Sequence, residues 1–375
     1  MKKLENPLYI SRPLLPSLDD LYVLLEEIWD CKWLTNMGKK HERFETLLKD
    51  ELEVPYVSIF NNGAIALTTA LKALHLPLGS EIITTPFTFA ATPHCISWNN
   101  LRPVFCDINS DIMTIDVGKI EEQITSETTA ILGVHVYGFP CDVEAIEQIA
   151  NEYRLKVVYD AAHAFSTKLN GVSIGKFGDI TMYSFHATKL FNTAEGGCLT
   201  YKDPDLVEKI YNLRNFGIRG QEAVEDIGIN GKMNEIQAAI GLLNLKLYKS
   251  EKDKRALVKK TYIERLKNVN GIRVIEMPKN TTDSFQYFPI IVEDGYGISR
   301  DQLYEKFTGY NIFTRKYFYP LCSDYKPYRY LQSSKPKNLP VANNIAKRVL
   351  CLPFFGGLKD VEVDMICEII KKNKK

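Results

Sequence analysis

Short apolar runs alternate with segments of helical periodicity through the first part of the chain. The run YVSIF (56–60) is followed by the turn NNG and then by residues 64–74, where Leu67, Leu71 and Leu74 fall on one helical face. Buried strands separated by helices are typical of a mainly parallel sheet covered by helices on both faces, so the pattern predicts an α/β fold. Further strand-like runs are SEIITT (80–85), RPVFCDI (102–108), TAILGVHVYG (129–138) and KVVYDAA (156–162).

The pattern changes after residue 230. A strong helical period covers residues 233–247, and the charged run at 249–260 is typical of a solvated helix. The rest mixes a strand-like run at 285–292 with a helical run at 360–372. We therefore expect a large domain over 1–245, which includes an N-terminal arm, and a smaller α+β domain over 246–375.

Composition narrows the class of protein. Of the 375 residues 45% are hydrophobic and 25% are charged, and the net charge of +1 gives no electrostatic footprint for nucleic acid or an anionic membrane. No run approaches the length of a membrane span, and the N-terminus MKKLENPLYISRP lacks the apolar core of a secretory signal. The eight scattered cysteines form no CxxC pair, so we expect free, mostly buried thiols in a reducing cytoplasm and no metal site.

Three predicted strands end in, or are followed by, polar or charged residues that could bind a ligand. In FNNGAIAL (60–67) a helix begins after a glycine turn, which either offers free N–H groups to an anion or is an ordinary βα turn. Asp160 ends the run KVVYD, where it either faces a cationic ligand atom or caps a helix. Lys189 follows the run GDITMYSFHAT, and a lone lysine is usually a solvated surface charge. Together, however, these three features are what pyridoxal 5'-phosphate (PLP) requires: a phosphate cup, a partner for the pyridinium nitrogen and an imine-forming amine.

With these motifs in place, the chain resembles the DegT/StrS-like sugar aminotransferases, a branch of the fold type I (aspartate aminotransferase-like) PLP enzymes. The resemblance covers essentially the whole chain and implies a large domain built on a mainly parallel sheet plus a smaller C-terminal α+β domain. It is carried by the ordered motifs WLTNMGKKHERFE, NNGAIAL, TPFTFAATPH, VHVYG, DAAHA, SFHATK…EGG, GINGKMNEIQAAIG and YFYPL.

The resemblance implies a role for each matching residue. Lys189 is expected to form the Schiff base with PLP and to move the proton during transamination, and Asp160 to keep the pyridine nitrogen protonated. Phe89 is expected to stack on the cofactor ring, and His163 to lie near its phenolic oxygen. The phosphate is assigned to Gly63, Ala64, Ser184 and, from the neighbouring subunit, Asn230, so an obligatory homodimer is expected.

For the nucleotide-sugar substrate, the resemblance points to His186, Arg315, Tyr317 and Tyr319, although the late aromatic residues could equally pack the small domain. Two positions depart from the family pattern. Ala64 stands where Thr or Ser is usual, which removes a hydroxyl contact to the phosphate. Cys322 stands where many relatives have histidine, which removes a contact to the nucleotide-sugar phosphates.

The implied reaction is a ping-pong transamination from L-glutamate, through a Schiff base on Lys189, to a keto-deoxysugar linked to a nucleotide. The segment SFHATKLFNTAEGG and the N-terminal IWDCKWLTNMG favour dTDP-4-keto-6-deoxyglucose as acceptor, which would give dTDP-4-amino-4,6-dideoxyglucose. UDP-linked 4-ketosugars and dTDP-3-ketosugars are the competing substrates. Two other classes stay open: a PLP-fold regulator or sensor without turnover, and a nucleotide-binding α/β protein without PLP. The presence of Lys189 and the absence of a cysteine cluster argue against the iron–sulfur dehydration known in some relatives.

Overall fold

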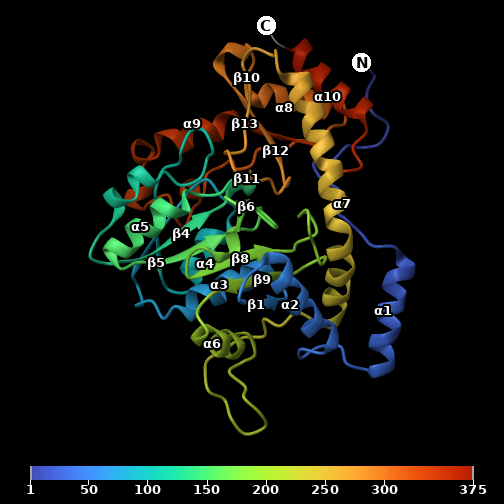
Figure 1. Ribbon diagram of the computed structural model, residues 1–375. Helices are drawn as coiled ribbons and strands as arrows, with labels where there is room; N and C mark the ends of the chain where they lie inside the picture. The colour runs from blue at the N-terminus through green and yellow to red at the C-terminus, as the bar shows by residue number, and fades with distance from the viewer. Residues whose placement is uncertain (1, 374–375) are drawn as a thin grey trace.

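The computed structural model describes residues 2–373 and has a seven-stranded sheet at its centre (Figure 1). The strand order is β1-β9-β8-β5-β4-β2-β3; β9 runs antiparallel to both of its neighbours, and the other four pairings are parallel. The expected α/β fold with a mainly parallel sheet is therefore confirmed. The strands are β1 (Tyr56–Phe60), β2 (Glu81–Thr84), β3 (Arg102–Phe105), β4 (Thr128–Val134), β5 (Lys156–Asp160), β8 (Ile180–Ser184) and β9 (Gly197–Tyr201).

Helices cover both faces of this sheet. Successive strand residues point to opposite faces, and both faces carry apolar side chains that the helices bury. In β4, Leu132 packs in one apolar cluster with Leu67, while its neighbour Ile131 packs in another with Ile146. The helices around the sheet are α2 (Lys39–Leu52), α3 (Gly63–Ala73), α4 (Ala91–Trp98), α5 (Val143–Tyr153) and α6 (Asp205–Arg214).

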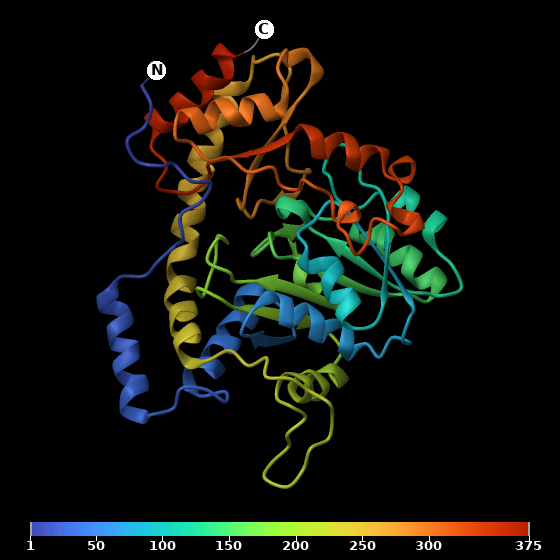
Figure 2. The same ribbon diagram turned by 180° about the vertical axis from the view of Figure 1, so that it is seen from behind.

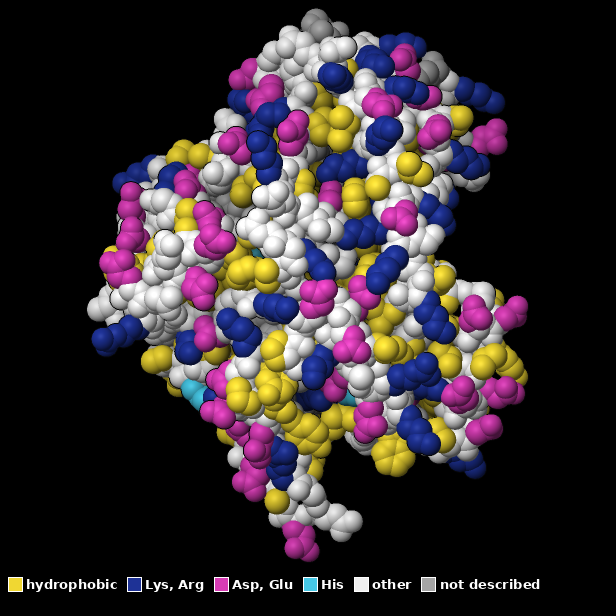
Figure 3. All heavy atoms as spheres, viewed as in Figure 1, with side chains coloured by type: hydrophobic (Ala, Val, Ile, Leu, Met, Phe, Trp, Pro, Cys, Tyr) yellow, Lys and Arg dark blue, Asp and Glu magenta, His cyan; other side chains and the backbone are white. Residues whose placement is uncertain are grey.

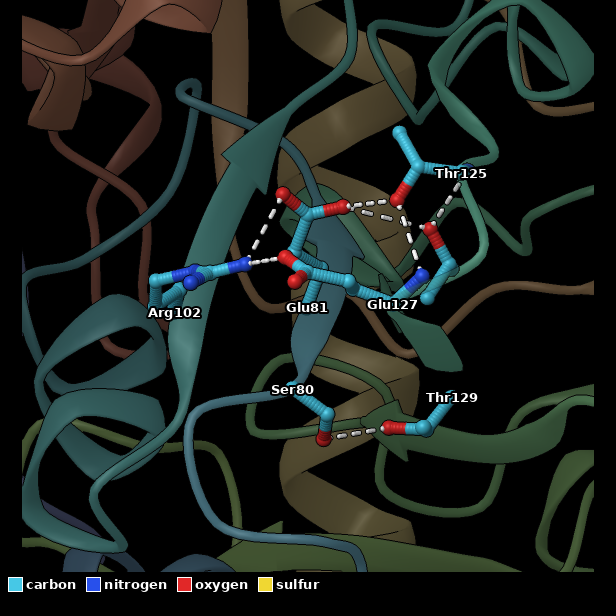
Figure 4. A network of polar contacts seen from close by, with 7 residues as sticks. Ser80, Glu81, Arg102, Thr125, Glu127 and Thr129 are labelled. Carbon is cyan, nitrogen blue, oxygen red and sulfur yellow. Dashed lines mark hydrogen bonds and ion pairs between the residues drawn. The ribbon is translucent and has the colours of Figure 1, made fainter.

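A polar network fixes the amino ends of β2, β3 and β4 (Figure 4). Glu81 accepts hydrogen bonds from Arg102 (3.3 Å) and from the Thr125 hydroxyl (2.6 Å), and Arg102 also pairs with Glu127. Since Arg102 is exposed, we assign this network a role in strand register and little in stability. Parallel strands end together, so the opposite edge of the sheet is free for the polar residues that follow β5 and β8.

Helix α7 (Glu235–Leu266) connects the sheet to the C-terminal part of the chain, and Figures 1 and 2 show it running from beside α2 up to the C-terminal part. It begins at a capping box on Asn234 and passes through residue 246 without a break, so the two predicted helical segments form one helix. The predicted division at 245/246 thus falls inside α7, and that domain boundary stays a prediction.

The C-terminal part has its own sheet and its own apolar cluster, which also takes in Leu8 from the start of the chain. Leu8 N–H donates to the Asn311 carbonyl (3.0 Å), so the first residues lie against this part. The elements here are β10 (Ile272–Val274), β12 (Phe288–Val292), β13 (Val349–Leu352), α8 (Arg300–Gly309), α9 (Pro340–Arg348) and α10 (Asp360–Lys372). A third small sheet pairs β11 (Thr281–Thr282) with β6 (Lys168–Leu169), and β6 with β7 (Val172–Ser173).

The sequence patterns match most of these elements and fail at some boundaries. The helix predicted at 64–74 is α3. The strand predicted at 285–292 begins only at Phe288, because the preceding residues leave the sheet and approach the centre of the molecule. None of the helices within the described range combines the length and the apolar composition needed to cross a membrane.

Candidate active site

A cavity of about 470 Å³ opens at the carboxyl edge of the central sheet, beside the start of α3. Its wall comes from the loops after β1, β2, β5 and β8 together with two segments of the C-terminal part. Segments distant in sequence meet here because the carboxyl ends of parallel strands share one edge. Nine of the predicted site residues line it: Gly63, Ala64, Phe89, Asp160, His163, Ser184, His186, Lys189 and Tyr317.

Lys189 lies in the turn that follows β8 and extends its amine into the cavity. Its backbone N–H donates to the His186 carbonyl (2.8 Å), which closes the turn. Within residues 2–373, Nζ of Lys189 has no hydrogen-bond or ion-pair partner. Burial lowers the pKa of the Lys189 amine to about 8, and the nearby Asp160 carboxylate opposes that shift. The neutral, nucleophilic form is therefore far more accessible than for a surface lysine.

Asp160 is the last residue of β5 and is buried at the cavity floor. One carboxylate oxygen accepts the Ala162 N–H (3.0 Å), and the other accepts the Thr92 hydroxyl (2.8 Å). Burial raises the pKa of Asp160, while these two hydrogen bonds and Lys189 act in the opposite direction. The carboxylate is thus held in one orientation with acceptor capacity left for a cationic partner. Thr92 was not among the predicted site residues, although it lies within the motif TPFTFAATPH.

His163 is buried on the same wall, three residues after Asp160. Its Nδ1 accepts the Tyr137 N–H (3.2 Å), so the proton of the neutral ring sits on Nε2. Burial, and secondarily the Lys189 charge, holds the pKa of His163 well below its usual value. The imidazole is therefore a neutral hydrogen-bond donor, and the Phe318 ring stacks on it at 5.9 Å.

The start of α3 forms an anion cradle next to Ser184. The N-cap Asn62 accepts the Ile65 N–H with its side chain (2.8 Å), and the N–H groups of Gly63 and Ala64, at the positive end of the helix, have no acceptor among residues 2–373. A Cβ atom on Gly63 would lie 3.0 Å from Ser184 Cβ, so glycine lets the helix start close to the serine hydroxyl. Ala64 adds no hydroxyl, and the cradle depends on backbone donors and Ser184.

Three predicted residues are not among those that line the cavity. Asn230 is exposed, and its carbonyl accepts a hydrogen bond from the Asn61 side chain (3.3 Å) at the rim. Arg315 is exposed and pairs through its backbone with Cys351. Tyr319 is 50% exposed, and its ring lies 5.1 Å from the Arg300 guanidinium carbon. The expected roles of all three stay predictions.

Cys322 is fully buried and is not among the residues that line the cavity, although it lies directly behind the lining residue Thr88. Its thiol donates to the Thr88 carbonyl (3.2 Å), and its N–H donates to the Pro86 carbonyl (2.9 Å). It therefore anchors the loop that presents Phe89, whose ring is 61% exposed at the cavity mouth.

Several cavity residues were not among the predicted site residues, although they lie in segments that the sequence patterns had already marked. Tyr287 and Phe318 supply aromatic wall, and Tyr287 meets the His163 ring edge-on at 5.1 Å. Glu195 lies at the rim, 3.5 Å from His186 Nε2. Tyr287 lies in FQYFPIIV, which was interpreted as a strand, while Phe318 lies in the motif YFYPL and Glu195 in SFHATK…EGG.

The residues present fit PLP on three counts. The free N–H groups at the start of α3 and the Ser184 hydroxyl suit a phosphate. The buried carboxylate of Asp160 suits a protonated ring nitrogen, and the unpartnered amine of Lys189 suits the aldehyde. Nothing in the donor set conflicts with this cofactor.

Comparison with known proteins gives matches over nearly the whole chain. The dTDP-4-amino-4,6-dideoxy-D-glucose transaminase of Escherichia coli is 44% identical over 364 residues, which are 96% of this chain and 97% of that protein. The protein of the same name from Shigella dysenteriae is 42% identical over 371 residues, 99% and 100% of the two chains. The solved structure of DesI in the presence of its TDP-sugar product superposes with a TM-score of 0.92 at 31% identity, covering 99% of this chain and 94% of that one.

Residues 20–371 match the model of a sequence family that is described as the "DegT/DnrJ/EryC1/StrS aminotransferase family". PLP is the cofactor of these enzymes, and the cavity holds the residues that suit it. With matches of this extent and a site of this chemistry, the chain belongs to the DegT/DnrJ/EryC1/StrS aminotransferase family and is a PLP-dependent sugar aminotransferase.

Proposed function

We propose that this aminotransferase moves the amino group of L-glutamate to the 4-keto carbon of dTDP-4-keto-6-deoxyglucose, giving dTDP-4-amino-4,6-dideoxyglucose. The observation that carries the proposal is the full-length identity of 42–44% to two transaminases named for that product. The meeting of Lys189, Asp160 and the α3 cradle in one cavity supports the same chemistry. DesI, whose structure was solved in the presence of its TDP-sugar product, supports a nucleotide-sugar substrate.

PLP, when bound, supplies an electron sink for the charge that develops as a substrate carbon loses its proton. The chain supplies the binding groups: the Gly63 and Ala64 N–H groups and Ser184 for the phosphate, and Asp160 for the ring nitrogen. His163 offers Nε2–H to the phenolic oxygen, and Phe89 covers the ring. These assignments rest on the placement of each group around the cavity and on its hydrogen-bonding capacity.

Lys189 is the proton carrier in this proposal. Because the pKa of its amine is lowered to about 8, Nζ can accept a proton from the donor amino acid and return it to the acceptor sugar near neutral pH. The buried aromatic wall, with Tyr287 and Phe318, keeps water away from the reacting atoms.

We also propose that the working unit is a homodimer in which Asn230 serves the site of the partner chain. Apolar side chains gather on the lower part of the face in Figure 3, over α6 and the segment after it and over α1 (Leu18–Cys31). Exposed large residues of α1, of the turn after α1 and of the segment after α6 include Trp29 (61%), Trp33 (54%), Val224 (70%) and Ile227 (87%). A second copy of the chain packed on this face would bury these apolar side chains.

A substrate panel tests the function. Purified enzyme with PLP and glutamate is offered dTDP-4-keto-6-deoxyglucose, a UDP-linked 4-ketosugar and a dTDP-3-ketosugar, and 2-oxoglutarate and the mass of the amino sugar are measured. We expect the highest kcat/KM with the first sugar and no turnover by Lys189→Ala.

The other possible outcomes of this assay would reject different parts of the proposed function. Preference for a different sugar would reject the proposed substrate while keeping the reaction. Bound PLP without turnover on any sugar would favour a sensor, and a colourless protein that gains no visible band with PLP would reject the proposed enzyme activity.

A further inference from the structure

The turn that carries Lys189 is held by a residue from the C-terminal part of the chain. Gln286 is 4% exposed and lies 97 positions further along, in the loop before β12. Its Oε1 accepts the Leu190 N–H (2.8 Å), and its Nε2 donates to the Thr188 carbonyl (3.1 Å). One side-chain amide therefore binds the two peptide groups that flank the Cα of Lys189.

This pairing needs the chemistry of an amide. The turn presents one donor and one acceptor side by side, and glutamine offers the complementary acceptor and donor on one planar group. A carboxylate in the same place would set oxygen against the Thr188 carbonyl, and an apolar side chain would leave both peptide groups unpaired in a buried site.

The loop that carries Gln286 is itself fixed at several points. The Phe285 carbonyl accepts from the buried Arg255 of α7 (3.2 Å), whose Nε is paired with Glu251 (2.7 Å). One residue earlier, Ser284 donates its hydroxyl to the His163 carbonyl (2.7 Å). The loop thus ties α7 to both the Asp160–His163 loop and the Lys189 turn.

Lys189 depends on this support because its amine has no partner of its own within the described residues. The direction of a long side chain without partners follows from its backbone and from packing. A backbone that shifts by about 1 Å at a reacting group is enough to cost roughly 100-fold in rate.

We propose that Gln286 is a positioning residue, which holds the Lys189 turn so that Nζ faces the bound cofactor. The inference rests on the proposed use of Lys189, and it adds a residue of the C-terminal part to the catalytic machinery. Gln286 is not among the residues that line the cavity, and its side-chain amide binds the backbone of the turn, so in this proposal it acts through that backbone.

The test compares Gln286→Met, which keeps the length and loses both hydrogen bonds, with Gln286→Glu, which keeps the shape and adds a charge. Gln302→Met is the matched control: Gln302 accepts the Ser299 N–H (2.9 Å) in the capping box of α8, away from the cavity. Three readouts need no sugar: hydrogen exchange at the Leu190 amide, labelling of Lys189 by acetic anhydride across pH, and the rate at which added PLP forms its visible band.

We expect Gln286→Met to lose protection at Leu190 and to form the band roughly 10- to 100-fold more slowly. With both glutamate and the acceptor sugar supplied, kcat should fall more than KM changes. Gln286→Glu should shift the labelling profile of Lys189 to higher pH, because a negative charge beside the turn favours the protonated amine. Gln302→Met should change none of these, even if it lowers stability.

The outcomes separate this inference from the proposed function. A folded Gln286→Met protein with unchanged band formation and unchanged Leu190 protection would overturn the positioning role. If Gln286→Met does not fold, an unshifted labelling profile together with an unchanged rate in Gln286→Glu would overturn that role as well. A wild-type protein that forms no band with PLP would instead overturn the proposed function.

Discussion

The amine of Lys189 is expected to lower the stability of the cofactor-free protein in a pH-dependent way. Its pKa falls from 10.5 to about 8 on folding, so between these values the unfolded chain binds more protons and stability rises with pH. Below pH 8 the amine is protonated in both the folded and the unfolded chain, so the folded state bears the full free-energy cost of burying the charge. We therefore expect Lys189→Met to raise the free energy of unfolding at pH 7 by on the order of 1–3 kcal/mol.

Urea unfolding of the cofactor-free proteins at pH 7 and pH 10, at one protein concentration, measures this effect. The gain of Lys189→Met should shrink towards pH 10, where the folded wild-type amine is neutral. Lys279→Met, at an exposed position, should show no such trend. A gain that is equal at both pH values would mean that packing, and not the charge, is responsible.

Single residues were predictable where their signal was local. Asp160 ends a predicted strand, and Gly63 and Lys189 each come shortly after one, so pattern and chemistry point to them together. Thr92 and Gln286 carry no such signal, because their partners are distant in sequence: Asp160 for Thr92, and the Lys189 turn for Gln286. The packing of Cys322 against Thr88 could not be predicted for the same reason.

At the scale of elements, the start of α3 depends on its close approach to β9. A Cβ atom on Gly197 would lie 2.7 Å from Gly63 Cα and 2.8 Å from the Tyr183 carbonyl oxygen, both of which are backbone atoms. The sheet or the helix would have to move, so Gly197→Ala should destabilise the protein by roughly 1–3 kcal/mol. Because the shift displaces the anion cradle, affinity for PLP should fall as well.

Calorimetry of the cofactor-free protein and titration with PLP check the two effects separately. Gly309→Ala is the control, since a Cβ there meets nothing within 4 Å at the end of α8. Should Gly197→Ala lose stability but bind PLP as tightly as wild type, the cradle would not depend on this contact.

Element boundaries were less predictable than element types. The antiparallel direction of β9 could not be predicted from the apolar pattern. A buried strand is a run of apolar residues whether it is parallel or antiparallel to its neighbours. Residues 285–287 look like strand but turn aside to reach the Lys189 turn and the cavity. Long-range contacts therefore overrode the local pattern at the point where the two parts of the chain meet.

At the scale of the whole molecule, the site draws on both the central-sheet part and the C-terminal part of the chain and, in our proposal, on a second chain. The cradle and the catalytic pair come from the central sheet, while Gln286 and the aromatic wall come from the C-terminal part. Asn230 follows the exposed segment after α6 and is outside its own cavity wall. If Asn230 completes the site of a partner, defects at Lys189 and Asn230 should complement each other between chains.

We expect Lys189→Ala and Asn230→Ala each to have low turnover alone at limiting PLP. Random reassociation of equal amounts gives half mixed dimers, and in each of these one of two sites combines an intact Lys189 with an intact Asn230. About one quarter of all sites should therefore regain activity. Mixing Lys189→Ala with Asp160→Asn should restore nothing, because both residues line the same cavity of one chain. Activity that stays at the sum of the separate proteins would show that Asn230 does not act across the interface.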